Sequence, residues 1–225
     1  MKILVVGVGA MGSIYAGMLA EAGNEVWISD TFEQHLKEIE QSGLFISGAS
    51  GKRMIPHLNI SRNLDLVGVC DLIIIATKAY AVDSAARTVK NNINRDSVIL
   101  TIQNGLGSGE KLNNVLKTSN ILLGVAGGFG ASIIRPGHVH HHDMKVIRLG
   151  EMFGGETKRL KMIAGLWKKA GFYVETFSDI NQLIWEKFIC NVAVSGAAAA
   201  FNRTVGEIIE DPITWEIAKK LGIEA

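Results

Sequence analysis

Three glycines near the start of the chain constrain its fold more than any other feature. Gly7, Gly9 and Gly12 lie in the stretch VVGVGAMG, directly after the apolar run KILVV and directly before a stretch with helical periodicity. A strand, a glycine-rich turn and a helix in this order let backbone amides and a helix N-terminus hold a pyrophosphate. The pattern predicts a dinucleotide-binding loop, with cofactor contacts from Gly7, Gly9, Ala10, Met11 and Gly12. A tight structural turn, or a flavin or S-adenosylmethionine site on a similar fold, is the alternative.

The rest of the chain alternates in the manner of a parallel sheet flanked by helices. Short β-branched runs such as EVWIS, DLIIIAT and SVILTI alternate with helical patterns, and LFISGASGKRMIP has the character of a hairpin. Later strands are punctuated by glycines, which suggests antiparallel additions, and the chain then turns helical. We therefore predict an α/β fold, with a Rossmann dinucleotide-binding domain over residues 1–178 and the start of an all-helical domain over residues 179–225.

Charge and cysteine content narrow the class of partner. The 225 residues carry 23 Lys and Arg against 22 Asp and Glu, so no overall field favours nucleic acid or an anionic membrane, and small molecules are the expected partners. Cys70 and Cys190 lie far apart in apolar runs, which predicts buried thiols and a reducing compartment. The N-terminal apolar run breaks into glycines too early for a signal peptide, so a cytoplasmic protein is expected.

An acidic residue follows the second expected strand. Asp30 lies 18 positions after Gly12 (30 minus 12), close to the spacing of about 20 at which a carboxylate bonds the adenosine ribose hydroxyls. A carboxylate there repels a 2′-phosphate, the next residue is Thr31, and no arginine is near in sequence. NADH is therefore favoured over NADPH. The alternative is that Asp30 only caps the following helix.

Polar residues also follow two later strands. Lys78 and Tyr80 come after DLIIIAT, and Gln103, Asn104 and Gly105 come after SVILTI. Ligands bind at the carboxyl ends of strands in open sheets, so both groups are expected to face the nicotinamide half of a dinucleotide. Each group alone also fits an ordinary loop or turn.

One lysine lies in a mostly apolar segment, WEKFICNVAVSGAAAAFN. On a helix from about residue 180 to 199, Lys187, Asn191 and Ser195 are spaced i, i+4 and i+8 and form one narrow polar stripe. A lysine followed by short neutral hydrogen-bonding groups is typical of the wall of a polar cleft. The alternative is a surface lysine that covers apolar neighbours with its aliphatic stem.

The stretch GHVHHHD raises the question of a metal. His138, His140 and His142 alternate along an expected strand, so all three could point to one face. Apart from Asp143, no acidic or cysteine partner is in view. We therefore predict no metal site.

Four motifs in order, GVGAMG, TKAYAV, TIQNGLG and WEKFICN, resemble the ketopantoate reductase (2-dehydropantoate 2-reductase) family over essentially the whole chain. The resemblance implies a Rossmann domain joined to an all-helical domain, and reduction of ketopantoate to pantoate on the route to pantothenate and coenzyme A, usually with NADPH. It also implies that Lys187 is the general acid and that Asn191 lies at the substrate. Asn104 and Lys78 match residues near the nicotinamide and substrate.

Three departures from the family pattern affect these expectations. Asp30 and Thr31 replace the usual arginine, which questions the preference for NADPH. Ser195 and Val205 stand where many members have substrate-binding asparagines, so the keto acid could differ. Only 38 residues follow Lys187 (225 minus 187), which is expected to mean a truncated or partial chain, or one that needs a partner. An apolar helix in so short a chain needs cover, which suggests a homodimer.

Two other functions stay open at this point. A related β-hydroxyacid or opine-type dehydrogenase also couples a Rossmann domain to a helical domain. A non-catalytic dinucleotide-binding protein is the second alternative. A Lys187→Ala variant that loses turnover and keeps cofactor affinity distinguishes an enzyme from both a binding module and a structural lysine.

Overall fold

The computed structural model describes residues 1–225, apart from the side chain of Met144. The chain divides into two compact units. The larger contains residues 1–103 and 107–180, and the smaller contains residues 104–106 and 181–225.

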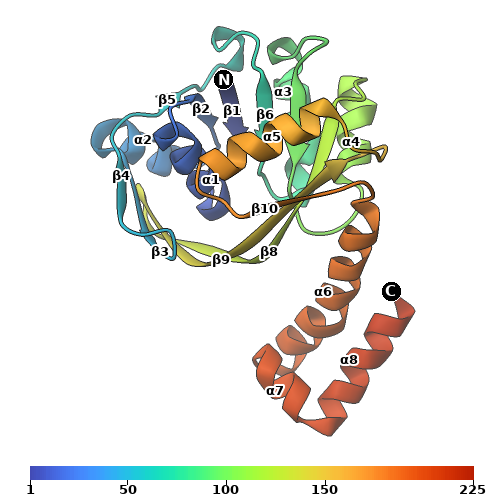
Figure 1. The fold of residues 1–225 in the computed structure, drawn as a ribbon. Coiled ribbons are helices and arrows are strands. Elements are labelled where there is room, and N and C mark those ends of the chain that lie inside the picture. Colours follow the sequence, from blue (N-terminus) through green and yellow to red (C-terminus); the bar gives the residue numbers. More distant parts are fainter. The chain divides into compact units, whose positions relative to one another are not determined.

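The larger unit is built on a ten-stranded mixed sheet (Figure 1). Nine strands follow the order β4-β3-β9-β8-β7-β6-β1-β2-β5, and β10 pairs with β9 off this path. The strands are β1 (Lys2–Val6), β2 (Glu25–Ser29), β3 (Leu44–Gly48), β4 (Arg53–Ile55), β5 (Asn59–Ile60), β6 (Leu72–Ile75), β7 (Val98–Thr101), β8 (Ile121–Arg135), β9 (His138–Glu151) and β10 (Val174–Phe177). The predicted α/β fold with an N-terminal Rossmann-type sheet is confirmed.

The middle of the sheet is parallel. β1 pairs with β2 and β6, β6 with β7, and β7 with the start of β8, all in parallel. β6 reads LIII and is buried at every residue, because helices cover both faces of a parallel sheet. The strands of the expected hairpin pair antiparallel, with Leu44 opposite Ile55. Of the late strands, β9 runs antiparallel to β8, whereas β10 joins β9 in parallel.

Five α-helices belong to the larger unit: α1 (Ala10–Glu21), α2 (Glu33–Ser42), α3 (Val82–Thr88), α4 (Ser108–Leu116) and α5 (Lys158–Lys169). In Figure 1, β3, β9 and β8 curve beneath α1 and α5. Helix α1 is buried without a break from Gly12 to Leu19. Gly17 permits this close packing, because a Cβ there would lie 2.7 Å from Cδ1 of Ile46. The helix that begins at the glycine turn is therefore fixed on all sides.

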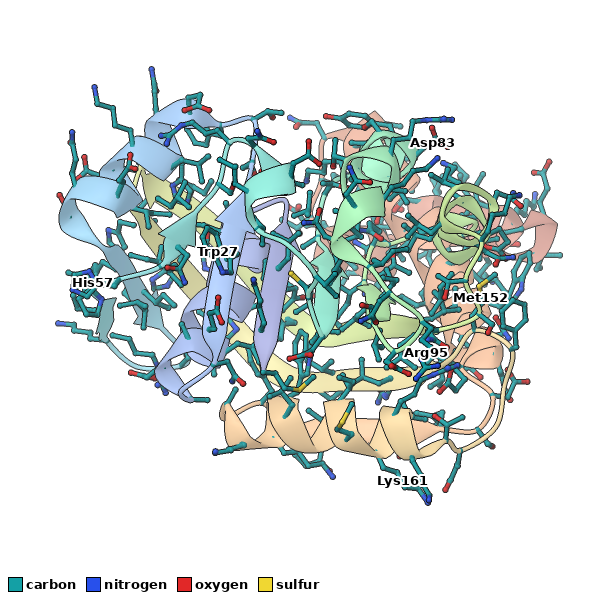
Figure 2. The ribbon with its side chains drawn as sticks, turned by 90° about the horizontal axis from the view of Figure 1, so that it is seen from above. Trp27, His57, Asp83, Arg95, Met152 and Lys161 are labelled. Atoms are coloured by element: carbon teal, nitrogen blue, oxygen red, sulfur yellow. The ribbon has the colours of Figure 1, made fainter. Side chains whose placement is uncertain are left out.

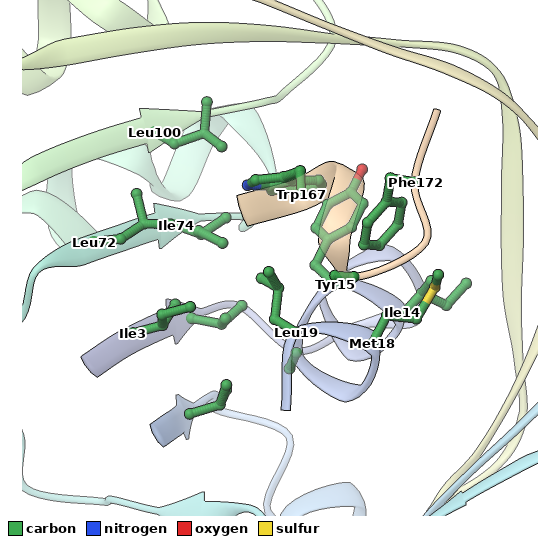
Figure 3. Close-up of a cluster of buried hydrophobic side chains, with 14 of the residues drawn as sticks. Ile3, Ile14, Tyr15, Met18, Leu19, Leu72, Ile74, Leu100, Trp167 and Phe172 are labelled. Atoms are coloured by element: carbon green, nitrogen blue, oxygen red, sulfur yellow. The ribbon is translucent and has the colours of Figure 1, made fainter. Parts of the chain in front are cut away.

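Aromatic side chains from distant parts of the chain meet on α1 (Figure 3). The Tyr15 ring lies 5.0 Å from the Trp167 ring of α5 and 6.1 Å from the Phe172 ring. Burial of aromatic rings is a large part of the stability of such a core. The side of α5 opposite Trp167 faces away from the sheet, and Lys161 points outward from it (Figure 2). Helix α5 therefore fastens α1 through one apolar face.

The smaller unit contains three helices, α6 (Asn181–Phe201), α7 (Val205–Glu210) and α8 (Pro212–Glu224). They enclose a small core of Ala197, Ile208 and Ala218. Thr204 and Glu207 form a reciprocal capping box at the start of α7. Asp211 caps α8, whose first residue is Pro212.

Helix α6 is apolar along most of its length. Its 21 residues and mean hydropathy of 1.2 meet a length and composition test for a membrane span, which core helices of soluble proteins also meet. Cys190 on α6 is exposed, so the prediction of two buried thiols was wrong for this residue. Cys70 is buried, and burial raises the pKa of its thiol to about 11. The sequence run around Cys190 is apolar, but the Cys190 side chain itself is left exposed.

Candidate functional site

The glycine turn between β1 and α1 is shaped by two close backbone contacts. Gly7 has a φ of +93°, and a Cβ there would lie 2.6 Å from the backbone nitrogen of Thr77. A Cβ on Gly12 would lie 1.9 Å from the carbonyl oxygen of Gly7. Both positions accept only glycine, because one needs a left-handed backbone and the other leaves no space for a side chain.

Gly9 is different, because a Cβ there would meet no atom within 4 Å. Gly9 is the N-cap of α1, and the first turn of a helix leaves its backbone N–H groups without partners in the helix. Those groups belong to Ala10, Met11 and Gly12. Open space beside exposed amides at the positive end of a helix is what a pyrophosphate needs.

Asp30 lies at the end of β2 and is bound to the glycine turn. Its Oδ2 accepts a hydrogen bond of 2.6 Å from the backbone N–H of Val8, and its Oδ1 accepts one of 2.9 Å from Phe32. The side chain is half-buried. Each oxygen keeps lone-pair capacity, so the carboxylate can also accept hydrogen bonds from two neighbouring hydroxyl groups.

Thr77 adds a hydroxyl group next to the same turn, and sequence reasoning missed it. Its Oγ1 is buried and has no hydrogen-bond partner within the described part of the chain. Buried hydroxyls normally have a partner, so an orphaned one beside the glycine turn fits a site that a polar ligand completes. The signal in the sequence was its position two residues after the end of the buried strand β6. Together with the space at Gly9, this hydroxyl supports the fit of a dinucleotide.

The polar residues after β6 and β7 have different surroundings. Lys78 is exposed and precedes a short 3-10 turn, Ala79–Ala81. The side-chain amide of Gln103 donates a hydrogen bond of 2.6 Å to the carbonyl of Ile75, and Gln103 Oε1 accepts a hydrogen bond from the Thr101 hydroxyl. These two bonds tie the ends of β6 and β7 together, and the expectation that Gln103 faces a nicotinamide stays a prediction. Asn104 is exposed and has no such tie to the strand ends.

Helix α6 carries the polar stripe. Lys187 and Asn191 are half-buried and Ser195 is exposed, and all three belong to the same unit as residues 104–106. Nearby, the rings of Trp185 and Phe188 meet edge to face at 5.8 Å. Within the smaller unit, the structure thus groups Asn104 with the helix that bears the lysine.

Among the sequence-predicted residues, the structure brings one set together in the larger unit. Asp30 is hydrogen-bonded to the glycine turn of residues 7–12, and the backbone of Thr77 lies against Gly7 of the same turn. Lys187, Asn191, Ser195 and Asn104 belong to the smaller unit. The residues predicted to bind the cofactor and those predicted to bind the substrate thus come largely from separate parts of the chain.

Three of the four histidines of β9 lie within hydrogen-bond distance of serines. The imidazoles of His138 and His140 lie 2.9 and 3.1 Å from the Oγ of Ser47, and His142 lies 2.9 Å from the Oγ of Ser132. Among the described side chains, no group of three or more His, Cys, Asp or Glu converges as metal ligands do. The alternating histidines contribute to the surface of the sheet through these hydroxyl contacts.

Residues 3–154 match the ketopantoate reductase PanE/ApbA family, and residues 179–225 match the ketopantoate reductase PanE/ApbA C-terminal family. A 2-dehydropantoate 2-reductase from a Nostoc species is 25% identical over 99% of this chain and 70% of its own length. The same name is given to a relative from Aquifex aeolicus that is 27% identical, over 98% of this chain and 70% of its own.

Solved structures agree with the sequence relatives. The crystal structure of a 2-dehydropantoate 2-reductase from Geobacter metallireducens has a TM-score of 0.92 at 27% identity, and the match covers 100% of this chain and 73% of the other. A ternary structure of D-mandelate dehydrogenase with NADH and anilino(oxo)acetate has a TM-score of 0.88 at 24% identity, over 97% of this chain and 70% of the other. At this identity, the similarity to D-mandelate dehydrogenase shows a shared fold and no more.

Proposed function

Because this chain belongs to the ketopantoate reductase PanE/ApbA family, we propose that it reduces 2-dehydropantoate to pantoate, on the route to pantothenate and coenzyme A. It is an NAD(P)-dependent oxidoreductase of that family. The observation that carries the proposal is the match of both family segments, 3–154 and 179–225, to one chain in which Asp30 is hydrogen-bonded to the glycine turn after β1. Two relatives described above have this activity as their name.

The larger unit binds the cofactor in this proposal. The N–H groups of the first turn of α1 hold the pyrophosphate, and the Asp30 carboxylate accepts hydrogen bonds from the adenosine ribose hydroxyls. When bound, the reduced nicotinamide supplies a hydride to the carbonyl carbon of the substrate. The Thr77 hydroxyl, orphaned among the described residues, gains a ligand partner.

Lys187 is the proposed proton donor. Negative charge grows on the carbonyl oxygen as the carbon is reduced, and a positioned ammonium group stabilises that charge and then gives the oxygen its proton. Asn191, Asn104 and Ser195 supply neutral hydrogen-bonding groups for the rest of a 2-keto acid. Lys78, exposed after β6, is the proposed contact near the nicotinamide. Proton donation would also account for a half-buried lysine, Lys187, on a mostly apolar helix.

The proposed cofactor is NADH rather than NADPH. A 2′-phosphate next to Asp30 would place two negative charges together. The structure brings one arginine near the start of α2, but the guanidinium of Arg62 is bound to Glu33 at 2.9 Å and to Glu40 at 3.3 Å. NADH is also the cofactor in the related D-mandelate dehydrogenase structure. A competition experiment with both cofactors tests this part.

The substrate is the least constrained part of the proposal. D-mandelate dehydrogenase shares the fold and was solved with anilino(oxo)acetate, which has an aromatic group. Ser195, where many family members have asparagine, is a smaller group and leaves room for a different side chain on the keto acid. We therefore propose a 2-keto acid as the substrate class and 2-dehydropantoate as the first candidate within it.

We also propose that the protein is a cytoplasmic homodimer. Large apolar side chains on α8 are exposed, including Ile213 at 74% and Ile223 at 86%, and such patches mark association surfaces. Light scattering on the purified protein tests the dimer, and a monomeric mass would contradict it. Fractionation of the source cells tests the location.

The function is tested by following the loss of nicotinamide absorbance with 2-dehydropantoate, a phenyl-substituted 2-keto acid and pyruvate in parallel. Fastest oxidation with 2-dehydropantoate is the expected result. Faster oxidation with the phenyl-substituted acid would move the substrate toward that of D-mandelate dehydrogenase. Tight NADH binding without oxidation by any of the three would favour a binding protein.

A further inference from the structure

A chain of buried hydrogen bonds leads from the turn between β8 and β9 to the glycine turn. It starts at the backbone N–H of Gly137, which donates to Nδ1 of His35 at 3.0 Å. Nε2 of His35 lies 3.0 Å from the Oγ of Ser13, and that hydroxyl donates to the carbonyl of Val8 at 2.8 Å. His35 is 0% exposed and Ser13 is 1% exposed. The two side chains have no contact with solvent.

The partners fix every proton along this chain. A backbone N–H can only donate, so Nδ1 of His35 is the acceptor and carries no proton. A carbonyl can only accept, so the Ser13 hydroxyl uses its one hydrogen on Val8 and accepts from Nε2–H of His35. The imidazole is therefore neutral and held in one tautomer. A protonated ring would turn Nδ1 into a donor facing another donor.

Val8 is consequently held on both sides. Its carbonyl accepts from Ser13, and its N–H donates to Asp30. Val8 lies between Gly7 and Gly9, so these two bonds set the orientation of the peptide groups that lead into α1. The orientation of the Asp30 carboxylate therefore also depends on Ser13 and His35, because its Oδ2 accepts the hydrogen bond from the Val8 N–H.

From these contacts we propose that Ser13 and His35 are positioning residues for the cofactor site, which orient the glycine turn and Asp30 through Val8 without touching the cofactor. The inference rests on the proposed function, because it assumes that a dinucleotide binds this turn. Its consequence is that removing the hydrogen bonds of either residue weakens cofactor binding, while the rate of the chemical step at the substrate is unchanged.

The surroundings of His35 favour its neutral form. Burial lowers the pKa of His35 below its ordinary value, and the charge of Asp30 opposes this shift. The Phe32 ring stacks on the imidazole at 5.7 Å. From its own helix, Glu38 approaches the turn that bonds to His35, with its Cγ 2.5 Å from where a Cβ on Gly137 would lie. α1 contributes the uncharged Ser13 to this contact, and the β8–β9 turn contributes a backbone group.

The test measures NADH affinity, thermal stability and the two kinetic constants of Ser13→Ala, His35→Leu and the double variant. Each single change is expected to raise the NADH Kd about ten-fold, the size of one lost buried hydrogen bond, with kcat unchanged at saturating NADH. The double variant is expected to be no weaker than the worse single one, because the two residues act in series. Additive losses in Kd, or an unchanged Kd with only a lower melting temperature, would overturn the proposal.

A conservative variant separates positioning from simple packing. His35→Gln can keep a neutral amide donor for Ser13, so NADH affinity is expected to stay within a few-fold of wild type. The wild-type Kd is expected to rise as pH falls through the pKa of His35, whereas the Gln variant shows no such step. A pH step of equal size in both proteins would contradict the role of His35.

His57 is exposed and takes no part in the hydrogen bonds between Gly137, His35, Ser13 and Val8. His57→Gln is therefore the matched control and should leave the NADH Kd, the melting temperature and the kinetic constants unchanged. The proposed function fails separately from this inference. If wild-type protein binds neither NADH nor NADPH, the cofactor assignment is wrong. If wild type binds NADH and the variants bind it equally well, the positioning role is wrong and the cofactor assignment stands.

Discussion

The carboxylate of Asp30 accepts a hydrogen bond of 2.6 Å from the backbone N–H of Val8, which connects the end of β2 to the glycine turn. One acid therefore serves two purposes. It holds the turn in place, and it keeps lone pairs that a ribose can use. The sequence shows the acid after the second strand, but it does not show the bond to Val8.

Replacing Asp30 tests the cofactor assignment. Asp30→Ala is expected to raise the Kd of NADH by about 10- to 100-fold, because charge-assisted hydrogen bonds contribute about 1.5–3 kcal/mol. The Kd of NADPH should rise less or fall, since the repulsion of its 2′-phosphate is removed. Isothermal titration with both cofactors measures the two affinities, with Asp96→Ala, at an exposed aspartate before β7, as the matched control. An unchanged ratio of the two affinities would show that Asp30 does not select the cofactor.

The two glycines Gly9 and Gly12 form a matched pair. Gly9→Ala places a methyl group where no protein atom lies within 4 Å, so the melting temperature should hold while NADH affinity falls. Gly12→Ala places a methyl group 1.9 Å from the Gly7 carbonyl, so both stability and affinity should fall. Calorimetry and a fluorescence titration separate the two effects. If Gly9→Ala bound NADH as wild type does, the pyrophosphate would have to lie elsewhere.

His141 predicts a pH dependence of stability. It is fully buried, and within the described part of the chain neither ring nitrogen makes a hydrogen bond of ordinary geometry. Burial lowers its pKa from 6.5 to about 4, against opposition from the charge and backbone of Asp143. The folded state thus binds fewer protons than the unfolded state between these pH values, so its stability is lost as pH falls from 6.5 toward 4.

The His141→Leu variant should therefore be more stable than wild type, and its advantage should grow across that pH window. A gain of about 1–3 kcal/mol is the cost of burying an unsatisfied polar group. Urea unfolding at several pH values measures it, with His57→Leu as an exposed control. Parallel stability curves for His141→Leu and wild type would mean that the imidazole is solvated or paired in solution.

The sequence was sufficient for features that depend on local pattern. Glycine spacing predicted the turn at residues 7–12, and apolar runs predicted the parallel strands. Features that depend on contacts between distant residues could not be predicted. His35 and Gly137 are 102 positions apart, and their hydrogen bond depends on how the β8–β9 turn meets α2. Gln103 follows a strand in the sequence, but that position does not reveal the bond from its amide to the carbonyl of Ile75 on the neighbouring strand.

The thiol prediction failed for a related reason. An apolar neighbourhood in sequence indicates burial only if another element covers that face. On α6, Ala197 is buried, whereas Cys190, two turns earlier in the same helix, is exposed. Local pattern therefore identified the helix but not its packing.

The central claim is that Lys187 gives a proton to a substrate carbonyl while a nicotinamide bound at the glycine turn supplies the hydride. The most direct test is the rate of NADH oxidation by 2-dehydropantoate in Lys187→Ala and in Lys220→Ala, an exposed lysine of α8, with NADH affinity measured on both. We predict that Lys187→Ala loses about 10²- to 10⁴-fold in kcat, the size expected of a general acid, and keeps wild-type NADH affinity. Lys220→Ala should behave as wild type. Wild-type turnover in a folded Lys187→Ala protein would contradict the account.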